Sequence, residues 1–340
     1  MKTTPTLLLL SLMLAGPVSA RGDDVGFPRL TGPYCGQRPP RAAPEVFGPG
    51  IVSFGYHEHR LAVSPDGTEI YFTVFSTSPF GAMILFTRLE DGVWTVPAVA
   101  SFSSAGMNLH PAFSPDGRRL FFTSTRPSSA DGVRGGRADI WFVERRGGGW
   151  SEPVPLGEAV NTEDQESSPS VTADATLFFE SNRGGDHKDW NLYCSKCVNG
   201  TYQQAEALPY PVNTEHGEGG PFVSPDGDFL LFNSDRPGTV GDADIHITFK
   251  GRDGSWTAPI NLGATVNSKV CDWSPMLTPD RKYLVFSSYR NTEPVGSRYP
   301  RYAAALEKEL GPPKSGFGCL YWVKAPVIGK ARKEALRASH

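Results

Sequence analysis

The sequence predicts an all-β protein, a single β-propeller built from four-stranded antiparallel blades. The main observation is a tetrapeptide that occurs five times, each time between two short apolar stretches. The copies lie 50, 58, 52 and 54 residues apart and read Ser64-Pro65-Asp66-Gly67, Ser114-Pro115-Asp116-Gly117, Thr172-Ala173-Asp174-Ala175, Ser224-Pro225-Asp226-Gly227 and Thr278-Pro279-Asp280-Arg281. This period indicates a repeat architecture, and four short strands per repeat are typical of a propeller blade.

The tetrapeptide is interpreted as a tight turn between the first two strands of each repeat. Proline fixes φ at the second turn position, aspartate bonds to its own backbone, and glycine ends a type I turn without steric penalty. In the second repeat, apolar residues 111–113 precede the turn and residues 120–123 follow it, as expected for strand, turn, strand. The Ser and Asp side chains are therefore expected to be structural and not a catalytic pair.

The remaining strands follow in the same order in each repeat. Third strands are expected at 83–87, 139–143, 191–195, 244–248 and 319–323, and fourth strands at Trp94, Trp150, Tyr202 and Trp256. The fifth repeat has no fourth strand. The segment from Pro44 to Phe47, ahead of the first repeat, has the pattern of a fourth strand but lacks the three strands that should precede it. We therefore expect five blades over residues 44–326, with six as the alternative, and an N-terminal strand that pairs with residues 319–323 and closes the ring.

The composition agrees with this fold. The 340 residues include 37 Gly and 30 Pro with 11% aromatics, and no long stretch has a helical apolar period, so almost no helix is expected. The net charge is −3, and no basic stripe alternates with stacking aromatics, which argues against a nucleic-acid partner.

Both ends of the chain lie outside the predicted ring. Residues 1–20 have the basic start, apolar run and small residues of a secretory signal peptide, and no other segment is long and apolar enough to span a membrane. We expect an exported monomer, periplasmic or extracellular, with an N-terminal extension over residues 21–43. Residues 327–340 are expected to form a frayed basic tail that contains Lys330, Arg332, Lys333 and Arg337.

An exported protein with five cysteines can form disulfides. Cys35 precedes the closing strand and Cys319 lies on its expected partner, so a bridge between them would fasten the ring. Cys194 and Cys197 flank a hairpin tip and form a second candidate pair, although three-residue spacing on a regular strand points side chains to opposite faces. Cys271 is the expected odd cysteine.

A further motif carries a family resemblance. The second strand of four repeats ends in Ser-x-Arg, at Arg126, Arg183, Arg236 and Arg290, and an Asp-Ile-Trp or Asp-Ile-His follows in two of them. Together with the Pro-Asp turns, these motifs resemble the TolB-like β-propeller family. The resemblance implies the fold, and it implies functions that range from periplasmic scaffolds and envelope-associated modules to propellers fused to peptidases or acting as polysaccharide lyases. A separate N-terminal α/β domain, as in TolB itself, is not expected here.

Candidate functional groups gather on one face of the predicted ring. Six residues before each turn stand Glu58, Asn108, Glu166, Glu218 and Asp272. These positions start the innermost strands, on the face opposite to the Ser-Pro-Asp-Gly turns. In one interpretation each carboxylate pairs with the arginine of a Ser-x-Arg motif. In the other, Glu58, Glu166, Glu218 and Asp272 surround an open channel mouth, where crowding raises pKa values and prepares general acids and bases.

Histidines and one insertion fall on the same face. His57, His59, His110, His187 and His216 are all expected in its loops, and His59 and His110 adjoin the acidic positions. A histidine with carboxylates from several blades could hold a divalent metal, but no ligand motif is present, so no resident metal or cofactor is expected. The insertion 291–318 carries Arg298 and Tyr299, is expected to contain a short helix at 303–310, and is interpreted as a lid or binding ridge.

Three hypotheses remain from the sequence, of which one, a purely structural propeller without a ligand, would leave the histidines on one face unexplained. The favoured one is a binding scaffold of the cell envelope that holds a protein or glycan on this face, because no complete catalytic constellation can be assembled. The alternative is a carbohydrate-active enzyme, a lyase or glycosidase, that uses the carboxylates and histidines at the channel mouth.

Overall fold

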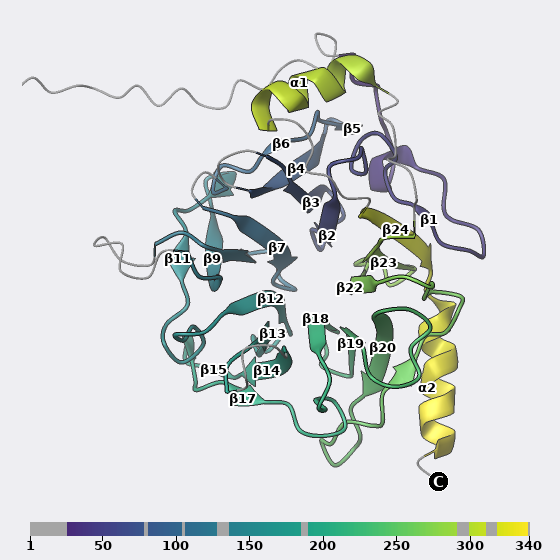
Figure 1. Cartoon of the computed structure of the whole chain (residues 1–340). Helices are drawn as coiled ribbons and strands as arrows, with labels where there is room; N and C mark the ends of the chain where they lie inside the picture. The colour runs from purple at the N-terminus through teal and green to yellow at the C-terminus, as the bar shows by residue number, and fades with distance from the viewer. Residues whose placement is uncertain are drawn as a thin grey trace, which may run out of the picture.

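The computed structural model confirms a single five-bladed β-propeller (Figure 1). It describes residues 26–77, 81–103, 106–127, 136–184, 190–290, 299–310 and 318–338. The predicted signal peptide lies outside these residues, as do His187 and Arg298. No helix within the described ranges is long and apolar enough to cross a membrane.

Each blade is an antiparallel sheet whose first strand lies at the channel. Blade 1 contains β2 (Glu58–Val63), β3 (Glu69–Phe75), β4 (Ala82–Glu90), β5 (Val93–Trp94) and β6 (Ala98–Val99). Blade 2 contains β7 (Asn108–Phe113), β8 (Arg119–Ser124), β9 (Asp139–Arg146), β10 (Gly149–Trp150) and β11 (Val154–Pro155). Blade 3 contains β12 (Glu166–Val171), β13 (Leu177–Ser181), β14 (Asn191–Ser195) and β17 (Glu206–Ala207), with a hairpin of β15 (Cys197–Val198) and β16 (Thr201–Tyr202). Blade 4 contains β18 (Glu218–Val223), β19 (Phe229–Ser234), β20 (Asp244–Phe249) and β21 (Ile260–Asn261).

Blade 5 closes the ring as the sequence predicts. Its strands are β22 (Asp272–Leu277), β23 (Tyr283–Ser288), β24 (Cys319–Lys324) and the N-terminal β1 (Glu45–Val46). Glu45 pairs with Trp322 and Val46 with Tyr321. The segment before β1 includes the 3-10 turn η1 (Tyr34–Gly36). It is also attached to blade 1, because the Trp94 indole donates to the Gly32 carbonyl at 2.7 Å.

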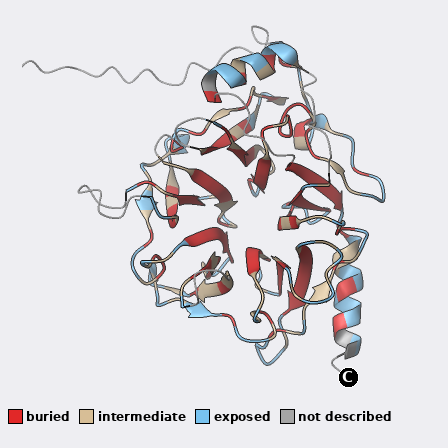
Figure 2. Cartoon of the chain, viewed as in Figure 1, coloured by how far each residue is buried: buried red, intermediate tan, exposed pale blue. Residues whose placement is uncertain are grey.

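The blades pack through the apolar faces of their sheets. Inner and middle strands are buried on both sides, as the ring of buried ribbon around the axis shows (Figure 2). Buried aromatic residues such as Phe72, Phe122 and Phe232 lie in clusters that join neighbouring blades. Such burial is worth roughly 1.5–3 kcal/mol per large apolar side chain, so the interfaces between blades supply most of the stabilisation.

The tetrapeptides form the expected turns. Ser64 donates through its hydroxyl to Asp66 at 2.6 Å, and the Asp66 carboxylate accepts the Thr68 amide at 3.0 Å. Gly67 has a φ of 75°, which an L side chain adopts only with strain. The polar turn side chains are thus used within the turn.

Two helices flank the ring, contrary to the expectation of almost none. Helix α1 (Pro300–Leu310) contains the predicted helical segment, but it packs through Tyr302 and Leu306 against the core. Tyr299 lies beside Phe27, at 6.4 Å between ring centroids, so the described part of the insertion covers the side of the propeller and is no lid over the channel (Figure 1).

Helix α2 (Pro326–Ala338) replaces the expected frayed tail. Its Ala331 and Ala335 are buried, four residues apart, and pack in the cluster that contains Ile247 and Phe249 of blade 4. The basic side chains Lys330 and Lys333 are exposed. Small alanines gave too weak an apolar period for the helix to be recognised beside so many basic residues.

Neither predicted disulfide is formed. Cys35, Cys194, Cys197 and Cys271 carry free thiols. Cys35 and Cys319 are buried in separate clusters of the core, on different sides of blade 5. Cys194 lies on β14 and Cys197 on β15, in different sheets.

Candidate functional site

The central channel is organised by a β-bulge in every innermost strand. The third residue of each strand has a left-handed φ, between 41° and 57°, and the pairing with the second strand shifts there. These residues are Arg60, His110, Ser168, Gly220 and Ser274. In four blades a proline follows, which suits a bulge because proline has no amide to donate to the ladder.

The bulges also link the blades to one another. Each bulge amide donates to a side-chain oxygen on the second strand of the preceding blade, at distances from 2.5 to 3.3 Å. The acceptors are Ser287, Thr73, Thr123, Glu180 and Asn233. This ring of hydrogen bonds fixes the channel wall, since each blade positions the next.

The acidic positions are structural anchors in blades 3 to 5. Glu166, Glu218 and Asp272 are fully buried, and each accepts the guanidinium of the Ser-x-Arg motif in its own blade, at 2.9, 3.0 and 2.5 Å. In blade 2, Arg126 bonds to Asn108 instead, at 2.6 Å. The arginines are Arg126, Arg183, Arg236 and Arg290, and each also donates to a carbonyl of the approach loop and lies over a phenylalanine. These carboxylates therefore do not surround an open mouth.

Blade 1 breaks this pattern. Val74 and Ser76 occupy the positions of the Ser and Arg of the motif. Phe72 corresponds to the phenylalanine on which the arginine lies in the other blades, and in blade 1 the ring of Phe54 lies near it, at 6.4 Å between centroids. Glu58 is left with the Phe54 and Tyr56 amides on one oxygen and no partner on Oε2. Burial raises the pKa of Glu58 to about 7, although the backbone hydrogen bonds oppose it.

His59 and His110 lie together in the channel and form part of a directed hydrogen-bond chain. The Trp273 indole can only donate, so His59 Nε2 accepts and its Nδ1–H donates to His110 Nε2 at 3.1 Å. His110 Nδ1–H then faces the hydroxyls of Ser167 and Ser168, at 2.8 and 3.1 Å. The Ser168 hydroxyl donates to buried Glu180 at 2.9 Å, which completes the chain across the channel.

Both histidines are therefore neutral structural groups. Burial lowers the pKa of His110 to about 3 and that of His59 well below its ordinary value, with a smaller effect of the neighbouring charges. His57 stacks on Phe75 at 4.9 Å, whereas His216 lies in a partly exposed loop beside Glu215. Within the described ranges, no three His, Cys, Asp or Glu side chains converge as metal ligands.

Arg60 is the channel residue that the sequence analysis missed. It extends from blade 1 across the axis, where its Nη2 donates to the carbonyls of Pro169 in blade 3 and Pro221 in blade 4, both at 2.9 Å. Its side chain is 2% exposed and its Nη1 is buried without a partner. The available signal was that blade 1 has Arg60-Leu61 where the other blades have a small or polar residue and proline.

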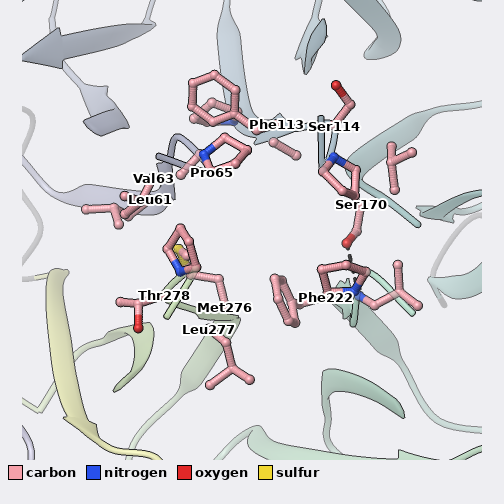
Figure 3. Close-up of a pocket in the computed structure, with 18 of the residues that line it drawn as sticks. Leu61, Val63, Pro65, Phe113, Ser114, Ser170, Phe222, Met276, Leu277 and Thr278 are labelled. Carbon is pink, nitrogen blue, oxygen red and sulfur yellow. Dashed lines mark hydrogen bonds between the residues drawn. The ribbon is translucent and has the colours of Figure 1, made fainter. Parts of the chain in front are cut away.

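Beyond Arg60 the channel opens as a funnel of about 240 Å³ toward the turns. Leu61, Phe222 and Met276, from blades 1, 4 and 5, line it, and Figure 3 shows the ring of Phe222 beside the opening. The prolines of four turns also line it, at Pro65, Pro115, Pro225 and Pro279. This cavity lies on the face opposite to the one where the sequence placed the site. We call it the funnel.

Comparisons with known proteins show a likeness of fold. No family model matches the sequence. No curated protein sequence matches it either. Among solved structures, the chain is similar to putative TolB from Agrobacterium tumefaciens, with 21% identity, a TM-score of 0.46 and coverage of 69% of this chain and 72% of that chain.

Two further solved structures are similar over about two thirds of this chain. TolB from Acinetobacter baumannii has 18% identity and a TM-score of 0.45, over 69% of this chain and 49% of that chain, so the match spans about half of that protein. The periplasmic gluconolactonase PpgL of Pseudomonas aeruginosa has 17% identity and a TM-score of 0.42, over 67% of this chain and 64% of that chain. These similarities concern the fold alone.

Proposed function

We propose that the protein is an exported, non-catalytic binding propeller that takes an apolar part of its ligand into the funnel. The observation that carries this proposal is the position of an apolar opening on the axis, between a fixed ring of bulges and a rim of turn prolines. Concave, apolar and preformed cavities are the usual sites of ligand binding. Export follows from the leader predicted at residues 1–20.

The carboxylates and histidines that suggested catalysis are bonded to other groups of the protein, which favours a binding protein over an enzyme. Three of the four candidate carboxylates are paired with arginine, and the fourth, Glu58, is fully buried and accepts the Phe54 amide. The two channel histidines are used in a hydrogen-bond chain that starts and ends on protein groups. A general acid or base must reach a substrate proton, and these buried groups offer no such access in the described structure.

The size and lining of the funnel limit the kinds of ligand that it can bind. Its volume corresponds to roughly eight water molecules, which suits a short chain or one inserted side chain better than a sugar polymer. Its walls are mainly Leu, Val, Phe, Met and Pro, so the favourable free energy of binding would come from burying apolar surface. A protein partner or a small molecule could present such a group.

The proposal is tested by obstructing the funnel. Ala112 lines it, and Ala112→Trp should fill it, whereas Ala304→Trp places the same side chain on the exposed face of α1 as a matched control. With 1-octanol as a neutral apolar probe, calorimetry should detect binding to the wild type and to Ala304→Trp but not to Ala112→Trp. Equal binding by all three, with unchanged circular dichroism, would place the site elsewhere.

A further inference from the structure

Arg60 is a buried cation without a direct ion-pair partner among the described residues. Among the described residues no carboxylate forms an ion pair with it, and its Nη1 is buried without an acceptor. Burial lowers the pKa of Arg60 to about 10, and the more distant Glu180 only partly opposes this. An unpaired buried charge is costly, so the position is better explained by an anion that arrives with a ligand than by stability.

Arg60 also lines the funnel, at its inner end. Next to it in the cavity wall are Leu61, Phe113, Phe222 and Met276. A molecule that fills the funnel would therefore bury its body against apolar side chains and place one end beside a guanidinium.

The other polar groups of the wall are already used. Ser114 and Thr278 donate to the aspartates of their own turns, at 2.6 and 2.7 Å, and Ser170 accepts the Val223 amide at 2.9 Å. Arg281 pairs with Asp226 at 2.9 Å. One buried donor without a partner remains, which matches a single small acceptor and not a phosphate, whose several charged oxygens need several donors.

We infer that the funnel binds a short alkyl carboxylate, with its chain against the apolar wall and its carboxylate on Arg60. This inference rests on the proposed function, because it names the ligand of the same cavity. A carboxylate accepts a charge-assisted hydrogen bond from a guanidinium, and between apolar walls that bond is stronger than at an exposed surface.

Three probes of equal chain length test the inference by calorimetry. Octanoate should bind the wild type about tenfold or more tightly than 1-octanol, because a hydrogen bond to a charged group is worth roughly 1.5–3 kcal/mol. Octylamine should bind more weakly than 1-octanol. Equal affinity for octanoate and 1-octanol would overturn the carboxylate inference while leaving the funnel as a binding site. If none of the three binds, the proposed function fails as well.

Two protein variants test whether the preference for octanoate depends on Arg60 and on the funnel, and a peptide tests the class of ligand. In Arg60→Gln the preference for octanoate over 1-octanol should disappear while 1-octanol still binds, and in Ala112→Trp neither should bind. If Arg60→Gln does not fold, the comparison of probes on the wild type still decides. A tripeptide with a C-terminal leucine and a free carboxylate should bind less tightly than octanoate, since its backbone polar groups would be buried without partners. Tighter binding of the peptide would overturn the assignment to a small alkyl carboxylate.

Discussion

The two ends of the central channel use opposite chemistry. Toward the long loops, the polar groups are numerous and buried, and nearly all have partners within the protein, as in the chain from Trp273 through the histidines to Glu180. Toward the turns, the channel is apolar and open, with the Nη1 of Arg60 as its one unpartnered buried donor among the described residues. A concentration of ionisable residues thus marks where the ring is held together, and the site for a ligand lies where such residues are scarce.

The largest expected effect is the loss of a buried anchor at the polar end. Arg183→Ala would leave the fully buried Glu166 without its cation, and breaking such a pair costs about 3–5 kcal/mol of unfolding free energy. Arg137→Ala is the matched control, because the Arg137–Glu163 pair is exposed and worth at most about 1 kcal/mol. Urea denaturation measures both, and equal losses would show that the anchors are not structural.

Blade 1 provides a second test, because its carboxyl has no arginine. The folded pKa of Glu58 is about 7 and its ordinary value is 4.5, so the protonated form is favoured in the folded state. Protonation of Glu58 therefore contributes up to about 3 kcal/mol to the free energy of unfolding. This contribution is fully present below pH 4.5 and is lost as the pH rises through 7. In Glu58→Gln this loss should be absent, so the variant should be the more stable one at pH 8. Urea midpoints from pH 5 to pH 8 measure the difference, and parallel profiles for wild type and variant would contradict it.

The histidine pair gives a pH dependence of the opposite sign. Because the folded pKa of His110 is about 3, its stabilising contribution is present above pH 6.5 and is lost as the pH falls. At pH 5 the loss is about 2 kcal/mol. His110→Asn should reduce this acid sensitivity by about that amount, since His59 and His246 still contribute, whereas His216→Asn, in a partly exposed loop, should retain it in full. Thermal melts at pH 5 and pH 7 compare the two variants, and an unchanged acid response in His110→Asn would mean that the channel histidine is hydrated.

The smallest effect is expected at the turns that form the rim of the funnel. Asp116 accepts hydrogen bonds from Ser114 and the Arg118 amide and forms an exposed ion pair with Arg118, so Asp116→Asn should cost about 1 kcal/mol of stability and leave octanoate binding unchanged. Calorimetry beside a thermal melt separates the two quantities. A loss of binding with a normal melt would give the turn side chain a direct part in recognition.

Much of the fold could be predicted from sequence because its signals repeat. Five turns at one period gave the blade number, and the missing fourth strand of the last repeat gave the closure by β1. The pairing of Glu166 with Arg183 was one of two arrangements that the repeats allowed. The exception at Glu58 was also visible, since Val74 and Ser76 stand where other repeats have Ser and Arg.

The funnel and Arg60 could not be found in the same way. Arg60 occurs in one blade only, and its path across the axis depends on a bulge whose register no linear pattern fixes. The funnel is lined by residues that each look like ordinary strand or turn positions. Only the closed ring brings Leu61, Phe222 and Met276 to one opening.

The central claim is that ligand binds at the turn end of the channel and not at the polar end. Methionine methyl groups can report both places, since Met276 lines the funnel, while Met107 directly precedes β7, on the loop side. In a protein labelled with ¹³C-methyl methionine, a titration with octanoate should shift the Met276 resonance and leave that of Met107 in place. A shift of Met107 with Met276 unchanged would contradict the account.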